Sequence, residues 1–85
     1  MTAIPLRVMV LDTWDEIRLT VPAETSVTEV KTRALDAARV RQPADDYLMK
    51  FRGAEVPEGV TTVSGAGLVP NAAVIVLSRH RNPAK

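Results

Sequence analysis

The chain has 85 residues, a length that allows one small domain and leaves no room for a second core. Hydrophobic residues make up 46% and charged residues 25%, which is typical of a folded globular domain rather than of a disordered chain or a membrane span. The net charge of +1 is too small to indicate nucleic acid or anionic lipid as the main partner. With no cysteine and one histidine, a disulfide framework, a structural zinc site and a thiol nucleophile are excluded, so composition favours a binding module.

An antiparallel hairpin is predicted near the N-terminus. Apolar residues alternate with others over 6–11 and again over 16–21, and the polar segment 12–15 between these strands is typical of a turn. Pro22 should end the second strand, because it has no amide hydrogen to give to a ladder. Trp14 lies in the turn, where it either stays exposed as a contact residue or folds back onto its own strands, and the sequence leaves both open.

A helix is predicted from Ser26 onwards. Ser26 and Glu29 have the spacing of a capping box, and Pro43 is expected to stop the helix before a loop over 44–46. An apolar stripe at helical spacing should pack on the sheet: Val27, Val30, Ala34 and Ala38. The charged residues of this segment are expected to face water: Lys31, Arg33, Asp36 and Arg39.

The second half of the chain predicts further strands. Residues 47–52 alternate as a third strand that Gly53 closes, and the turn-rich stretch 54–67 allows one short edge strand around Glu55 and Val56. Val63 and Leu68 are the expected core anchors of the turn-rich region. Both alternating sets of the last strand, 74–77, are apolar, which favours a central strand with neighbours on both edges.

The order of these elements predicts an α+β fold, in which one helix packs across a mixed sheet of four to five strands. This order resembles ubiquitin and the wider β-grasp family. The residues that carry the resemblance are Val30-Lys31, Leu48 to Gly53, Val56, Gly59, Val63-Ser64, Leu68 and Val74 to Arg79. The likeness extends from about residue 6 to 81, so residues 1–81 are expected to form one ubiquitin-like domain and 82–85 a short disordered tail.

One departure from the ubiquitin pattern concerns covalent chemistry. In the family the last strand leads to a Gly-Gly pair whose carboxylate is adenylated and joined to lysine, or thiolated in the sulfur carriers. The matching positions here are Asn82 and Pro83, and proline restricts both its own φ and the residue before it. The resemblance therefore implies a protein that is neither conjugated nor a sulfur carrier, similar to small bacterial ubiquitin-like proteins found with specialised secretion systems.

A second departure concerns the face by which ubiquitin is recognised. Lys50 stands where the family has an exposed isoleucine, whereas Ile75 and Leu77 match outward positions of the last strand. Leu48 and Met9 should point the same way, so the face stays apolar, with Arg7, Lys50, Arg52 and Arg79 around it. The expected partner-binding residues are Met9, Trp14, Leu48, Lys50, Arg52, Ile75, Leu77 and Arg79.

These expectations describe a cytoplasmic, non-covalent protein–protein interaction module. Two alternatives stay open: a homo-oligomer whose sheet faces cover each other, and an accessory component of a bacterial secretion-type complex. Nucleic-acid binding by the basic end, Arg79, Arg81 and Lys85, is less expected because no aromatic residues are interleaved with these charges.

No enzyme, cofactor or metal is expected. His80 has no orienting carboxylate or nucleophile near it in the sequence. The acidic groups at 12–16 and 45–46 lack the spacing of a calcium loop, and Gly65-Ala66-Gly67 is not followed by a phosphate-binding motif. The N-terminal residues also lack the charged and apolar regions of a signal peptide.

Overall fold

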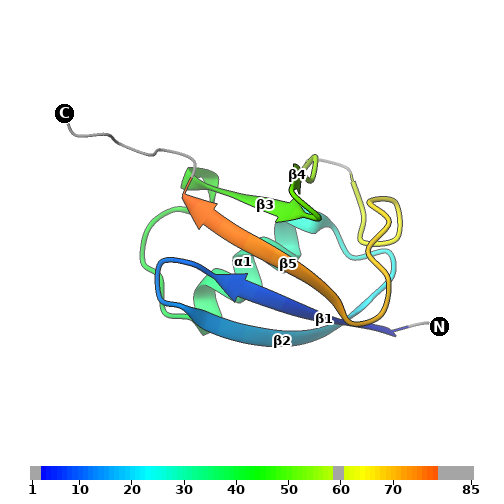
Figure 1. The fold of residues 1–85 in the computed structure, drawn as a ribbon, viewed down its shortest axis with the longest axis horizontal. Helices are drawn as coiled ribbons and strands as arrows, with labels where there is room; N and C mark the ends of the chain where they lie inside the picture. The colour runs from blue at the N-terminus through cyan, green and yellow to red at the C-terminus, as the bar shows by residue number, and fades with distance from the viewer. Residues whose placement is uncertain (1–2, 59–60, 79–85) are drawn as a thin grey trace.

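A five-stranded sheet with one α-helix across it forms the described part of the chain, residues 3–58 and 61–78 of a computed structural model. The elements are β1 (Ala3–Val10), β2 (Asp15–Pro22), α1 (Val27–Ala37), the 3-10 helix η1 (Ala44–Asp46), β3 (Tyr47–Phe51), β4 (Ala54–Glu55) and β5 (Ala72–Ser78). The strand order is β2-β1-β5-β3-β4, with β1 and β5 parallel and the other pairs antiparallel. In Figure 1 α1 lies behind the sheet and no described segment crosses in front of it. The predicted α+β architecture is confirmed.

The last strand, β5, is central, as its two apolar sets predicted. It pairs with β1 on one side and β3 on the other, and Val74 and Val76 are fully buried towards α1. Its alternate residues Ile75 and Leu77 point to the opposite face of the sheet, because successive strand side chains alternate. We call the α1 side the inner face and the other side the outer face.

The core fills the space between the inner face and α1. It is rich in β-branched residues, which pack well on a pleated surface: Val8, Val10, Val21, Val27, Val30, Val63, Val74 and Val76 are all at most 1% exposed. Val63 and Leu68, the two expected anchors of the turn-rich region, are buried. The region after β3 therefore contributes to the same core as the helix and the sheet.

Helix α1 begins as predicted and ends earlier than predicted. The Ser26 hydroxyl oxygen accepts a hydrogen bond from the Glu29 amide at 3.1 Å, while the Glu29 carboxylate pairs with Arg33. At the other end Arg39 takes a left-handed conformation with φ 63°, its amide bonds to the Asp36 carbonyl, and the Val40 amide bonds to Leu35. This is a Schellman motif, so the helix ends at Ala37 and the prediction that Pro43 stops it was wrong. Residues 44–46, expected as a loop, form η1.

Lys31, expected to face water, is buried. Its side chain is 1% exposed, and Nζ donates to the Tyr47 carbonyl at 2.8 Å and to both carboxylate oxygens of Glu58 at 2.8 and 2.9 Å. The expectation was wrong because Lys31 lies four residues after Val27, on the stripe that packs against the sheet. A buried ammonium is tolerated only with full hydrogen bonding and a counter-charge. Glu58 supplies the counter-charge, and its carboxylate and the Tyr47 carbonyl together accept the hydrogen bonds.

Tyr47, the first residue of β3, connects this strand to the β1–β2 turn. Its ring is buried, and its hydroxyl donates to Asp12 Oδ2 at 2.5 Å. Burial, and after it the hydrogen bond to Asp12 and the charges of Asp12 and Asp46, together raise the pKa of the Tyr47 phenol to about 12. The neutral phenol is therefore the form that the fold favours.

We expect Glu58→Gln to lower the free energy of unfolding by about 3 kcal/mol, because the buried Lys31 ammonium loses its counter-charge. Glu29→Gln is the matched control, since it removes a half-exposed ion pair with Arg33 and should cost no more than about 0.5 kcal/mol. Urea unfolding of both variants measures the difference. Equal destabilisation by the two substitutions would contradict the assigned role of Glu58.

We expect Tyr47, the one tyrosine of the chain, to ionise near pH 12 in the folded protein. Its folded pKa lies above the unfolded value of 10.0, so the native state holds the proton more tightly. The stability that this gives is complete below the unfolded pKa and is lost as the pH rises through the folded one. Absorbance titration of tyrosinate measures the pKa, and Asp12→Asn should lower it whereas Asp15→Asn should not. Ionisation of the folded wild type near pH 10 would contradict the assignment.

Candidate functional site

One row of residues crosses the outer face through all five strands. Glu16 is the partner of Met9, Met9 of Ile75, Ile75 of Lys50, and Lys50 of Glu55 in the strand register. The row therefore has an apolar centre, a lysine beside it and a carboxylate at each end. The next register along β3 and β5 pairs Leu48 with Leu77 on the same face.

Four of the expected contact residues meet on this face as one apolar patch, Met9, Leu48, Ile75 and Leu77. Ile75 is 40% exposed and the other three are half-buried. A shallow depression of about 150 Å³ lies along Met9 and Ile75, with Arg7 and Glu16 also lining it. Alternation within three adjacent strands brings these residues together, although they are far apart in the sequence.

Only some of the basic residues expected around the apolar patch lie beside it. Lys50 lies in the central row, next to Ile75. Arg52 belongs to a two-residue turn between β3 and β4, in which Arg52 and Gly53 have φ of 57° and 84°, the requirement of a type I′ turn. The Arg52 guanidinium lies 5.2 Å from the ring centroid of Phe51, a cation–π contact with a residue that packs against the core. Arg79 lies outside the described residues.

Trp14 is exposed at the β1–β2 turn. Its side chain is 76% exposed, so the alternative in which it folds back onto the strands was wrong. Its φ of 55° is uncommon for a large side chain and costs about 1–2 kcal/mol. The turn adjoins β5, because the Leu11 amide donates to the Val76 carbonyl at 3.0 Å. Trp14 therefore lies at one end of the sheet rather than within the apolar patch.

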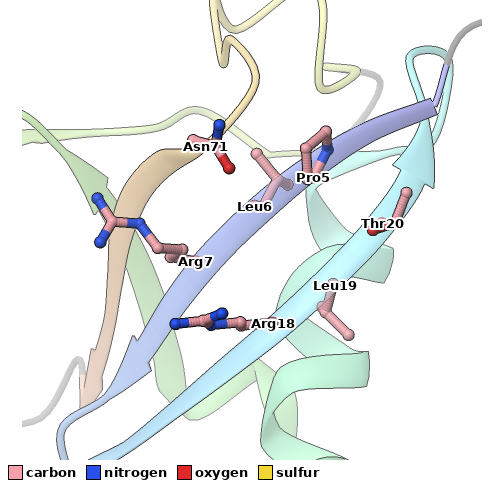
Figure 2. Close-up of a pocket in the computed structure, with 7 residues that line it drawn as sticks. All are labelled: Pro5, Leu6, Arg7, Arg18, Leu19, Thr20 and Asn71. Carbon is pink, nitrogen blue, oxygen red and sulfur yellow. The ribbon is translucent and has the colours of Figure 1, made fainter.

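A pair of arginines on the outer face was missed by the sequence reasoning, which considered Arg7 but not Arg18. These residues are direct partners on β1 and β2. With Asn71 and Thr20 they line a depression of about 440 Å³, and Figure 2 shows both guanidinium groups extending from their strands towards β5. The sequence does allow the pair to be predicted. In an antiparallel hairpin, residues at equal distances from the middle of the turn are partners, and Arg7 and Arg18 are at equal distances.

Acidic side chains gather near the hairpin turn, but they are not arranged around a common point. Asp12 accepts the hydrogen bond of Tyr47, and Glu16 lies 3.7 Å from Arg18 Nε. Within residues 3–58 and 61–78 no group of three or more His, Asp or Glu side chains is placed to hold a metal ion. In the same residues no helix has the length and apolar character needed to cross a membrane.

Comparison with known proteins gives similarity at the level of structure. No protein-family model and no curated protein sequence matches the chain. Ubiquitin of Caldiarchaeum subterraneum is 14% identical, with a TM-score of 0.78, 92% of this chain and 95% of that chain covered. A de novo designed protein based on ubiquitin is 11% identical, with a TM-score of 0.79 and coverage of 98% and 96%. A structure described as "Molecular Mimicry of SUMO promotes DNA repair" is 17% identical, with a TM-score of 0.78 and coverage of 89% and 91%.

At these identities the similarity concerns the fold alone. It covers almost the whole of both chains in each comparison, which agrees with the strand order and the single helix across the sheet. The ubiquitin-like expectation drawn from the order of the elements is confirmed. The chain has the ubiquitin-like β-grasp fold.

Proposed function

We propose that this protein is a non-covalent interaction module that binds a partner protein through the outer face of its sheet. The observation that carries the proposal is the apolar patch, because four apolar side chains from three strands meet on a face that no described segment covers. A contiguous apolar area surrounded by charge is typical of a protein interaction site. The ubiquitin-like fold supports a binding role in general terms.

The composition of the patch indicates what each side chain contributes. Ile75 is the most exposed of the four and lies at the centre of the row, which suits an anchor that enters a partner's pocket. Met9 beside it is flexible and adapts to different shapes. Lys50 adds a charge where the resemblance to ubiquitin places an isoleucine, so a partner with an apolar group opposite this position is disfavoured.

A homo-oligomer is the second candidate, favoured by the same apolar patch, since a second copy would cover it as well as a different protein does. The charges argue against a symmetric contact centred on Lys50, because each copy would bring its lysine towards the other. The non-enzymatic role and the cytoplasmic location belong to the same proposal and rest on the composition of the chain.

We expect the double variant Ile75→Asp and Leu77→Asp to keep its fold and to lose partner binding by at least about tenfold, because two carboxylates would be desolvated in the contact. Val69→Asp is the matched control, since Val69 is 52% exposed but lies in the loop before β5. The measurement is quantitative capture of partner proteins from the source organism by immobilised wild type and by both variants, after circular dichroism has checked their folding.

Two results would contradict the proposal. One is capture by the double variant that equals capture by Val69→Asp. The other is wild-type light scattering that reports a dimer across a dilution series while the double variant is a monomer, which would assign the apolar patch to self-association.

The proposal includes the absence of covalent attachment, because Asn82 and Pro83 occupy the positions of the family's Gly-Gly pair. Incubation with ATP and a ubiquitin-type activating enzyme of the same organism should give no adenylate, as measured by pyrophosphate release. A variant with Asn82→Gly and Pro83→Gly that ends at residue 83 is the comparison, since it supplies the extended glycine pair. Adenylation of the unmodified chain would overturn this part of the proposal.

A further inference from the structure

Two like charges lie side by side on the outer face, and only one of them has an ion pair within the described residues. Arg7 and Arg18 are direct cross-strand partners, an arrangement that is destabilising for like charges. Arg18 is 80% exposed and forms an ion pair with Glu16 at 3.7 Å, which is weak because it is exposed, and Arg7 has no ion pair within the described residues. The two arginines and Glu16 therefore leave a net positive charge at this place on the sheet.

The surroundings of this pair form a cradle, which we define as Arg7, Arg18, Thr20 and Asn71 around the depression of about 440 Å³ (Figure 2). The backbone holds Asn71 at this place. The Ala72 amide donates to the Val69 carbonyl at 2.9 Å, Asn71 has φ 66°, and the Asn71 amide donates to the Pro5 carbonyl at 2.7 Å. The turn before β5 is thus tied to β1, and the Asn71 side chain adds an amide group to the two guanidinium groups.

The chemistry of the cradle is that of an oxyanion site. A guanidinium presents its N–H groups as a planar fork that matches the two oxygens of a carboxylate or a phosphoryl group. Thr20 and Asn71 supply neutral donors at the edge of the same depression. A bound oxyanion would also offset the repulsion between the two arginines. Binding would therefore be favoured both by the hydrogen bonds to the oxyanion and by the reduced repulsion.

The position of the cradle beside the apolar patch indicates the kind of ligand. The cradle and the depression along Met9 and Ile75 share Arg7. Their register rows, Arg18–Arg7–Ala73 and Glu16–Met9–Ile75, lie two residues apart along the strands, or about 7 Å. An extended peptide spaces its alternate side chains by the same distance. Glu16 in the second row repels a second anionic group there.

We propose that the cradle binds the carboxylate or phosphoryl group of an extended segment of a partner protein, with an apolar side chain two residues away on the apolar patch. This rests on the proposed function, in which the outer face binds a protein. It adds the chemistry of the segment: one anionic side chain, with an apolar neighbour at the alternate position.

The test is an NMR titration of the labelled protein with the peptide acetyl-Leu-Ala-Glu-Ala-Leu-amide and with its counterpart that has Gln in place of Glu. The leucines on both sides of the glutamate make the probe independent of strand direction. We expect the Glu peptide to shift the side-chain N–H signals of Arg7, Arg18 and Asn71 together with the Ile75 methyl signals, and to bind at least fivefold more tightly than the Gln peptide. Arg18→Gln should remove this preference, whereas Arg41→Gln, an equal charge change in an exposed loop, should retain it.

Several outcomes would overturn the proposal, each in a different way. Equal affinity for both peptides, with Ile75 shifts, would reject the cradle and leave the proposed binding face intact. Arginine shifts without Ile75 shifts, reproduced by inorganic phosphate alone, would reduce the cradle to a small-ion site and argue against the proposed face. Equal losses of the preference for the Glu peptide in Arg18→Gln and Arg41→Gln would show that net charge, and not the cradle, causes the preference. Tighter binding of a short oligothymidylate than of the Glu peptide would assign the arginines to nucleic acid instead.

Discussion

The buried Lys31 ammonium ties helix α1 to the second half of the chain. It joins α1 to the first residue of β3 through the Tyr47 carbonyl, and to the segment that follows β4 through Glu58. A desolvated ammonium that lost one of these partners would be left as an uncompensated buried charge, so the helix and both partner segments keep their places together. Tyr47 extends the same connection to the β1–β2 turn through Asp12. These contacts thereby link the helix, the start of β3, the segment after β4 and the β1–β2 turn.

The outer face takes its character from this one-sided construction. All the described covering elements lie on the α1 side, so the alternate residues of β1, β3 and β5 meet solvent (Figure 1). Along the strands these residues change from a basic row at Arg7 and Arg18 to an apolar row at Met9 and Ile75. The face thus carries a basic area and an apolar area two residues apart along the strands.

Periodicity predicted the hairpin, the central position of the last strand and the burial of Val63 and Leu68, because each depends on local alternation or on strongly apolar composition. The helix end was missed because Arg39 adopts a left-handed conformation for which glycine is the usual signal. The burial of Lys31 was not predicted because charged residues usually face water, although its helical position places it on the apolar stripe. Its partner Glu58 is 27 residues away, a separation that local patterns do not address. The patch residues were predicted through the resemblance to ubiquitin, whereas the arginine pair required the cross-strand register.

The surface proposed to meet a partner is the outer face of the sheet, and not the helix or the hairpin turn. Methyl cross-saturation NMR, with the captured partner irradiated and this protein labelled at Ile, Leu, Met and Val methyl groups, measures that surface directly. Binding through the outer face should give the largest intensity losses at Met9, Leu48, Ile75 and Leu77. Losses concentrated at Val40 or Val69, with these four unaffected, would contradict it.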